Sequence, residues 1–578
     1  MPILNLLRAL LPPLDWGRGY SVPAFQSDLI AGIIVLFLTI PQVIAYAFLA
    51  GMPPETGLYA AFAALVGYGL FGGSRTLAVG PQAIIAIMTL EAATKFAAPY
   101  SAEYLAVVAR LGLVIGGMLV LLRIVNFGAV ISFLSHAVIT GFIAAAALLI
   151  IASQIPSILG LPAPASTSLV DIGELIAGSV HQINYAAVGI AGGSIALLLF
   201  CKFLLQDILL RLGMGVQWAG SIVRSAPMYV VVLTILAVSG MSLDQVEDVA
   251  VVGDVPTQLP HLSLASISLE DIRKLAPSAL LISMVVFLSN MSIAAAMASK
   301  RREKIDANQE LVAAGVANLG TSLFGGFPVA GSFGRTAVNA SAGALTPLAS
   351  IVTGMCVIMT LVWFAPLFYY LPKAALCAII VVSAAQLIEI HAIRKIFSFS
   401  PFDSVTFAFT FLSVLLFGVE TGIITGIAIS FVLLIRASSR PHIAVVGRWK
   451  DTEHFRNVLR HEVETVPSVL ALRVDESLYF VNTRYIENYI FNRVAELPEV
   501  KHVLLICTAT NFIDSAGLEL LELLSDNLAE VGVTLHLSEV KSPVMDRLED
   551  TEFYKHMKGK VFFTTDLAMK ELAGERVA

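Results

Sequence analysis

Apolar stretches long enough to form membrane helices recur along the first 440 residues of this 578-residue chain. A helix that crosses a bilayer needs about 20 mostly apolar residues, and a helix broken near the midplane needs fewer. We predict fourteen spans, seven in each half, at 29–50, 57–72, 80–96, 104–122, 127–152, 183–205, 227–241, 277–299, 309–325, 333–345, 347–369, 373–389, 403–418 and 421–437. Only 13% of the residues are charged, about half the share in soluble domains. Disordered, collagenous and ordinary soluble proteins are therefore excluded.

The charges are unevenly distributed along the chain. Residues 441–578 hold 37 of the 78 charged residues, so we predict a membrane domain over 1–440 and an acidic soluble domain over 441–578. With the N-terminus inside, 15 Lys and Arg lie on the inner side of the spans and 4 on the outer side, and the long loop at 153–182 has none. Because positive residues stay cytoplasmic, both termini are expected in the cytoplasm. The charge gives no indication of nucleic-acid binding.

The cysteines and the N-terminal segment indicate no further chemistry. The four cysteines are scattered without metal-ligand spacing, which predicts buried thiols, no metal site and no cofactor: Cys201, Cys356, Cys377 and Cys507. The first 27 residues lack the pattern of a cleavable signal, so the first span is expected to direct its own insertion. No nucleophile–base pair or phosphate-binding loop stands out, and an enzyme is the least favoured class.

The two halves carry a trace of an internal repeat. The segment LFGG at 70–73 recurs at 323–326, a spacing of 253, and the same spacing sets Gln82 opposite Arg335. Because each half has an odd number of spans, the copies, about 28–241 and 277–437, must cross the membrane in opposite directions. A chance echo in a Gly-rich chain is the alternative. Both copies precede short segments interrupted by Gly and Pro, a pairing typical of a transporter's binding site.

These paired segments have the chemistry of an anion site. A half-helix that begins near the midplane presents unpaired N–H groups and the positive end of its dipole. Pro81 suits a first helical turn, and Gly80, Gly331 and Gly334 let the backbone approach a ligand. Arg335 adds a full charge that faces a cavity or a partner. The alternative is that Arg335 pairs with a carboxylate or carbonyl groups and only holds the fold.

Several motifs resemble the SulP sulfate-permease family. They are PQVIAYAFLAGMPPETGLYAAF at 41–62, AVGPQA at 78–83, SHAVITGF at 135–142, NQEL at 308–311 and FPVAGSFGRTAVN at 327–339. The tail resembles the STAS domain that family members carry. The resemblance implies an α-helical membrane protein with a 7+7 inverted repeat, divided into a core that moves as an elevator against a gate. It also implies sulfate, bicarbonate, chloride, oxalate or C4-dicarboxylate as substrate, moved by proton symport, sodium symport or anion exchange.

The resemblance also implies which residues bind the substrate, between the third and tenth helices. They are Gln42, Tyr46, Gly80, Gln82, Ser332, Phe333, Gly334 and Arg335. A Pro-Gln pair inside an apolar helix supports Gln42 independently, because a buried amide without a partner is costly. The alternative for each residue is a packing role, which small residues commonly have in membrane helices.

One departure from the family bears on ion coupling. Many relatives have an acidic residue in the eighth helix, where this chain has Ser289. A serine cannot relay a proton at that position, which argues against proton coupling through the usual site. Asn290 and Ser292 offer neutral oxygens, with Ser289, to a coupling sodium ion. Exchange of one anion for another, without a coupling cation, is an equally possible mechanism.

The tail changes to strand–helix alternation. Strands are predicted at 468–474, 478–482, 501–507 and 533–540, with helices at 483–496 and 515–531. The segment Asp514, Ser515, Ala516 and Gly517 resembles the STAS switch, but Ala516 replaces the serine that is phosphorylated in anti-sigma-factor antagonists. A helix cap by Asp514 or Ser515 is the simpler interpretation. In related transporters the domain serves dimer contact, trafficking or regulation, so a cytoplasmic regulatory protein is a candidate partner.

Three functions remain open from the sequence. The first is a secondary active anion transporter in the bacterial inner membrane, expected to be a homodimer. The second is a passive anion channel on the same scaffold. The third is a membrane-anchored sensor that reports anion occupancy through the STAS domain.

Overall fold

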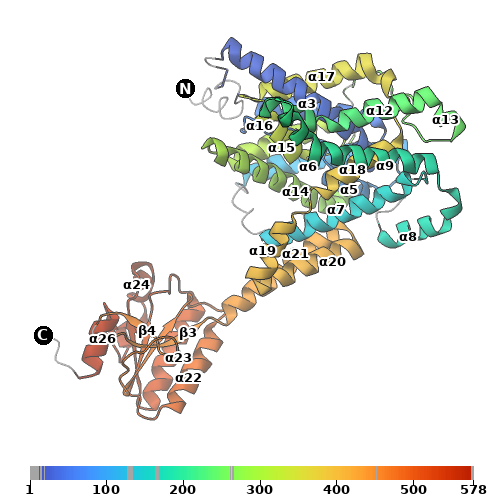
Figure 1. Ribbon diagram of the computed structural model, residues 1–578. Helices are drawn as coiled ribbons and strands as arrows, with labels where there is room; N and C mark the ends of the chain where they lie inside the picture. The colour runs from blue at the N-terminus through green and yellow to red at the C-terminus, as the bar shows by residue number, and fades with distance from the viewer. Residues whose placement is uncertain are drawn as a thin grey trace. The chain divides into compact units, whose positions relative to one another are not determined.

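The computed structural model describes residues 20–125, 135–162, 168–260, 266–450 and 452–574, with a few isolated positions (Figure 1). The chain divides into two compact units, Met1–Ala428 and Ile429–Ala578.

Each of the fourteen predicted spans coincides with a helix. These helices are α3 (Val22–Leu49), α4 (Pro54–Phe71), α5 (Ala83–Ala93), α6 (Ala102–Ile124), α7 (His136–Ile158), α9 (Tyr185–Phe200), α12 (Ala226–Met241), α14 (Leu269–Arg301), α15 (Ala307–Leu323), α16 (Phe333–Ser341), α17 (Leu348–Phe364), α18 (Lys373–Ala385), α20 (Pro401–Phe417) and α21 (Val419–Ser439). Within the described residues, eight helical segments are long and apolar enough to cross a membrane alone. The predicted count of fourteen is consistent with this architecture.

Shorter elements join these helices. They are α8 (Leu169–Gly178), η2 (Val180–Gln182), η3 (Cys201–Leu205), α10 (Gln206–Arg211), α11 (Val216–Arg224), α13 (Leu243–Val246), η4 (Ala365–Phe368) and α19 (Ile390–Phe399). Helix α8 corrects the prediction of a plain loop at 153–182, since the Ser168 hydroxyl accepts from the Asp171 N–H and caps a helix there. The start of the predicted span at 127 lies outside the described residues.

The membrane unit contains two bundles of packed helices. In the first, α15 packs on α6 and α4, α17 on α4 and α3, and α14 on α6. In the second, α7 packs on α20 and α18, while α9 contacts α18 and α12. Gly116 of α6 and Gly315 of α15 face each other so closely that a Cβ on either would lie 2.9–3.0 Å from the other's carbonyl oxygen. Small residues allow this approach where no hydrophobic effect drives helices together.

The second unit is a six-stranded sheet with helices on both faces. The strands run in the order β4-β3-β5-β6-β7-β8, with β5 to β8 parallel and β3 and β4 antiparallel. Their bounds are β3 (Ile443–Arg448), β4 (Phe455–Asn457), β5 (Val469–Val474), β6 (His502–Ile506), β7 (Thr534–Ser538) and β8 (Val561–Phe562). The helices are α22 (Thr483–Glu496), α23 (Ser515–Glu530), α24 (Ser542–Leu548), α25 (Glu552–His556) and α26 (Thr565–Leu572).

Most predicted elements of this unit are confirmed, and one is wrong. The segments 468–474, 501–507 and 533–540 contain β5, β6 and β7, and both predicted helices are present. Residues 478–482 form a turn instead of a strand. The Asn482 side chain donates to the Ser477 carbonyl and accepts from the Tyr479 N–H. These local bonds compete with sheet pairing, and only Leu478 makes an isolated bridge, to Ile513.

Candidate functional site

Two short helices begin at a pair of crossing strands. Strand β1 (Val79–Gly80) pairs antiparallel with β2 (Ala330–Gly331), and α5 and α16 start directly after them. The N-cap residues are Gln82 for α5 and Ser332 for α16. Antiparallel strands that lead into helices bring two helix N-termini to one region. The predicted half-helices are thus present.

The structure corrects the alignment of the two repeats at this point. Nine residues separate Gly73 from Gln82, but six separate Gly326 from Ser332. The first copy therefore has a loop three residues longer, and the spacing falls from 253 to 250 at the N-caps. Gln82 is the counterpart of Ser332 instead of Arg335, which lies one helical turn further along α16.

Side chains from outside the half-helices fix the crossing strands. The Asn290 Oδ1 accepts from the Gly331 N–H at 2.6 Å, and the Ser289 hydroxyl donates to the Gly331 carbonyl at 3.3 Å. The Thr336 hydroxyl oxygen accepts from the Ala78 N–H at 3.0 Å. Each strand is two residues long, so these bonds supply the order that two short strands cannot maintain alone.

Arg335 is the charged group of the site. Its side chain is fully buried, and its Nη2 donates to the Pro81 carbonyl at 2.7 Å. Its Nε and Nη1 are buried without a hydrogen-bond partner. No described carboxylate forms an ion pair with it. The bond to the Pro81 carbonyl is a contact of the kind that the structural alternative allows, but it uses only one of the guanidinium nitrogens. A buried guanidinium with two unused donors is costly, and an anion would remove that cost.

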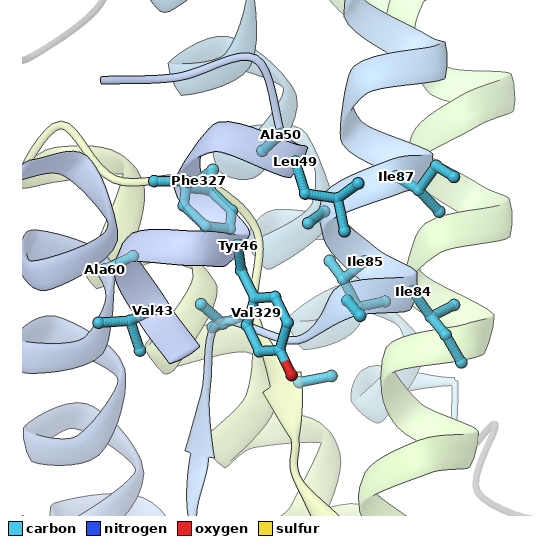
Figure 2. Packing of buried hydrophobic residues seen from close by; sticks show 14 of the residues in the cluster. Val43, Tyr46, Leu49, Ala50, Ala60, Ile84, Ile85, Ile87, Phe327 and Val329 are labelled. Carbon is cyan, nitrogen blue, oxygen red and sulfur yellow. The ribbon is translucent and has the colours of Figure 1, made fainter. Parts of the chain in front are cut away.

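Two predicted residues are buried on α3, the helix that packs against α16. Tyr46 is 7% exposed and packs in the apolar cluster of Figure 2, where its ring lies beside Val329 and its hydroxyl points away from Leu49. Gln42 lies one turn earlier and is buried, and its Oε1 has no partner. The Pro41-Gln42 signal thus identified a polar group inside the first bundle.

Two cavities meet at the start of α16. The first, of about 330 Å³, is lined by Gln42, Phe333, Gly334 and Ser383, and we call it the Gln42 cavity. The second, of about 410 Å³, is lined by Gln82, Ser289, Ser292 and Phe333, and we call it the Gln82 cavity. Phe333 lines both and is 56% exposed. Tyr46, Gly80, Ser332 and Arg335 lie behind these walls.

The three residues predicted to hold a coupling cation do not converge. Ser289 and Ser292 share one face of α14, as residues three apart do, and both line the Gln82 cavity. Asn290 is fully buried, and its Oδ1 is already bonded to the Gly331 N–H. Within the described residues, no group of three His, Cys, Asp or Glu side chains could hold a metal ion.

Two buried carboxylates that position the site escaped the sequence analysis. Glu310 accepts from the Tyr68 hydroxyl at 2.9 Å and from the Gly73 N–H at 3.2 Å, which anchors the loop before β1. Asp28 accepts from Leu345 N–H and Thr346, just after α16. The NQEL motif contains Glu310 and could have indicated it, because an acid in an apolar helix needs donors. Asp28 looked like an ordinary residue at the start of a span.

The STAS-like motif acts as a helix cap. The Asp514 Oδ1 accepts from the Gly517 N–H at 2.8 Å, and its Oδ2 accepts from the Phe480 N–H at 3.0 Å. Asp514 is thus the N-cap of α23, and Ser515 is its first residue. Both carboxylate oxygens are in use.

The family follows from the matched sequence models. Residues 25–410 match the sulfate permease family, and residues 460–568 match the STAS domain. The chain belongs to the sulfate permease family. It is 30% identical over 559 residues to sulfate transporter 4.1, chloroplastic, of Arabidopsis thaliana, covering 94% of this chain and 79% of that one. A probable sulfate transporter of Mycobacterium tuberculosis is 30% identical over 533 residues, with 92% of each chain covered.

Solved structures share the fold of this sulfate permease family member. The murine Solute Carrier 26 family member A9 anion transporter, in its inward-facing state, superposes with a TM-score of 0.87 at 23% identity, covering 99% of this chain and 95% of that one. The transmembrane domain of a cyanobacterial bicarbonate transporter gives a TM-score of 0.59 at 19% identity, covering 71% and 98%. The predicted helical membrane fold with a STAS domain is confirmed. Because the named relatives are transporters, the chain is a multi-pass anion transporter and not an enzyme.

Proposed function

We propose that this protein is a secondary active transporter that holds a small inorganic oxyanion between the N-termini of α5 and α16. The observation that carries the proposal is the buried Arg335 guanidinium, with Nε and Nη1 unpartnered. Two helix N-termini add partial positive charge to this full charge. The site is thus electrostatically incomplete until an anion enters.

Sulfate is the substrate to test first. The curated relatives named above are sulfate transporters that match 92–94% of this chain. A dianion would offset the guanidinium and both helix dipoles together, whereas a monoanion would offset about half of that charge. Bicarbonate, chloride and C4-dicarboxylates remain the competing cargoes.

An elevator movement fits the division into two bundles. The Gln42 cavity is lined by α3 and α16, which belong with the first bundle, and by α9, α12 and α18 of the second. If the first bundle moved as a body against the second, the anion would travel with α5, α16 and Arg335. The Gln82 cavity, where Ser289 and Ser292 offer neutral hydroxyls, is the place we propose for a coupling sodium ion.

Uptake into proteoliposomes tests the proposal and separates its alternatives. We would measure labelled sulfate, bicarbonate and fumarate uptake with and without an inward sodium gradient, a proton gradient or a trapped counter-anion. Accumulation of one anion against its gradient supports secondary transport and identifies the coupling. Saturation without accumulation would indicate a channel, and binding without flux a sensor.

The remaining proposals concern organisation. We propose residues 1–440 as the transport domain and 441–578 as the STAS domain, since α21 ends at Ser439 and β3 begins at Ile443. We also propose a homodimer in the plasma membrane with both termini in the cytoplasm, following the loop charges. A regulatory protein that contacts the segment Asp514 to Gly517 is proposed for the STAS domain.

A further inference from the structure

A third cavity of the membrane unit holds a lysine that forms no ion pair with a carboxylate among the described residues. This cavity, of about 400 Å³, lies between α3, α7 and α18 and is lined by Ala45, Gln154, Ser157, Asp248, Lys373 and Ile380, among others. We call it the Lys373 cavity. By the distribution of loop charges it opens on the outer side of the membrane, whereas the Gln42 and Gln82 cavities open on the inner side.

The wall of the Lys373 cavity is polar where α7 crosses it. Ser153 and Gln154 are 6% and 7% exposed, and the Gln154 Nε2 donates to the Ser153 hydroxyl at 2.9 Å. Ser157 follows one turn later on the same helix. Polar side chains inside a membrane helix face a water-filled path or a ligand. The polar face of α7 therefore offers hydrogen-bonding groups to a ligand in this cavity.

Lys373 differs from the other lysines on this side of the membrane. Lys95 pairs with Glu420, and Lys274 pairs with Glu270 at 2.7 Å. Lys373 forms no ion pair with a described carboxylate, and its Nζ lies 5.5 Å from the centre of the Phe48 ring. An aromatic face leaves the positive charge available to an anion, because it stabilises a cation only weakly at exposed sites.

The Lys373 cavity and the Gln42 cavity share two lining helices, α3 and α18. Helix α18 presents Lys373 and Ile380 to this cavity and Ser383, one turn later, to the Gln42 cavity. Helix α3 does the same with Ala45 and Gln42. A layer that includes Ala45 and Ile380 thus separates the two cavities.

We propose that the Lys373 cavity is a capture site, where an oxyanion binds before it reaches the Arg335 site. This inference rests on the proposed transport function. Lys373 supplies the charge, and Gln154 and Ser157 supply neutral donors. Asp248, which lines the same cavity, repels the anion electrostatically and so shortens the time that it stays bound.

Lys373 and Asp248 carry opposite charges, so removing each charge should change the KM for sulfate in opposite directions. A dianion about 10 Å from one unit charge in water changes its local concentration about fourfold. Lys373→Gln should raise the KM for sulfate taken up from the outer side by about 3- to 10-fold, and Asp248→Asn should lower it. Both effects should shrink at high salt, because screening shortens the range of exposed charges. Lys274→Gln, which removes a lysine already paired with Glu270, is the matched control.

A cysteine-labelling experiment measures anion binding in the cavity without measuring transport. Ser157→Cys in a Cys377→Ser background would be labelled in sealed right-side-out vesicles with membrane-impermeant anionic and cationic methanethiosulfonates and quantified by mass spectrometry. We expect sulfate, but not gluconate, to slow labelling, and we expect Lys373→Gln to reduce the ratio of anionic to cationic rates at least threefold. An unchanged ratio and no sulfate protection would overturn the capture site.

The same measurement separates this inference from the proposed function. In an Arg335→Gln background, transport is expected to fail while sulfate still protects the cysteine at 157. Loss of protection in that background would show that occupancy of this cavity depends on the Arg335 site, which overturns an independent capture site. Protection with normal transport would leave the capture site standing and contradict the role of Arg335.

Discussion

A methyl group added at Gly80 should weaken anion binding without unfolding the protein. A Cβ at this position would lie 3.2 Å from the Arg335 Nη2 and 3.5 Å from its Cζ. The guanidinium, whose Nη2 contacts the Pro81 carbonyl at 2.7 Å, would have to move by a few tenths of an ångström. A hydrogen bond from the displaced guanidinium to the anion would contribute about 1.5–3 kcal/mol, so poorer alignment of that bond should cost about 1–2 kcal/mol of binding free energy. That corresponds to a dissociation constant about 5- to 30-fold higher.

Isothermal titration of sulfate into purified Gly80→Ala protein would measure this change. Gly117→Ala on α6 is the control, because a Cβ there meets nothing within 4 Å. The control should bind like the unmodified protein, and both variants should elute as folded protein on size exclusion. Unchanged affinity in Gly80→Ala would refute the argument that the position of Arg335 determines anion binding.

Three further predictions concern buried or paired charges. Burial and, next, His502 lower the pKa of His536 to about 4, so the unfolded chain takes up a proton below about pH 6.5 that the folded domain refuses. The free energy of unfolding of this domain should therefore be highest above pH 6.5 and fall by about 2 kcal/mol towards pH 4. Hydrogen exchange of the β7 amides would measure this fall, and His536→Asn should abolish it. Glu310→Gln should lower the free energy of unfolding by about 1–3 kcal/mol, seen as a lower melting temperature; an unchanged value would reject the carboxylate as the anchor of the loop before β1. Lys95→Met should speed hydrogen exchange at the start of α21, because the ion pair with Glu420 connects the turn after α5 to that helix. Equal exchange rates in the variant and the unmodified protein would show that the ion pair does not stabilise the start of α21.

The sequence was sufficient for features that each segment carries by itself. A membrane helix needs its own apolar length, so a helix could be predicted for each of the fourteen segments separately. The half-helices were visible because Pro81 and the glycines around them interrupt apolar runs. In the tail, helical periodicity located α22 and α23 to within one residue. These signals are local, and tertiary structure does not change them.

The missed features depend on partners distant in the sequence. Asp28 bonds to the Thr346 hydroxyl, 318 residues away, and no local pattern announces that contact. The repeat spacing was misread because three extra residues follow Gly73, which the N-cap positions of α5 and α16 reveal. Asn290 looked like a cation ligand, but its Oδ1 supports β2. The sequence shows that a side chain is polar, but it does not show which distant group forms a hydrogen bond with that side chain.

Direct binding of sulfate to purified Arg335→Gln protein tests the central claim. Arg110→Gln is the matched control, because Arg110 is also an arginine of a membrane helix but already contacts Asp271 at 3.5 Å and the Ser266 carbonyl at 3.2 Å. We predict that the control binds sulfate like the unmodified protein, while folded Arg335→Gln binds at least about tenfold more weakly, since it loses charge-assisted bonds. Equal affinity in folded Arg335→Gln would show that the anion binds elsewhere.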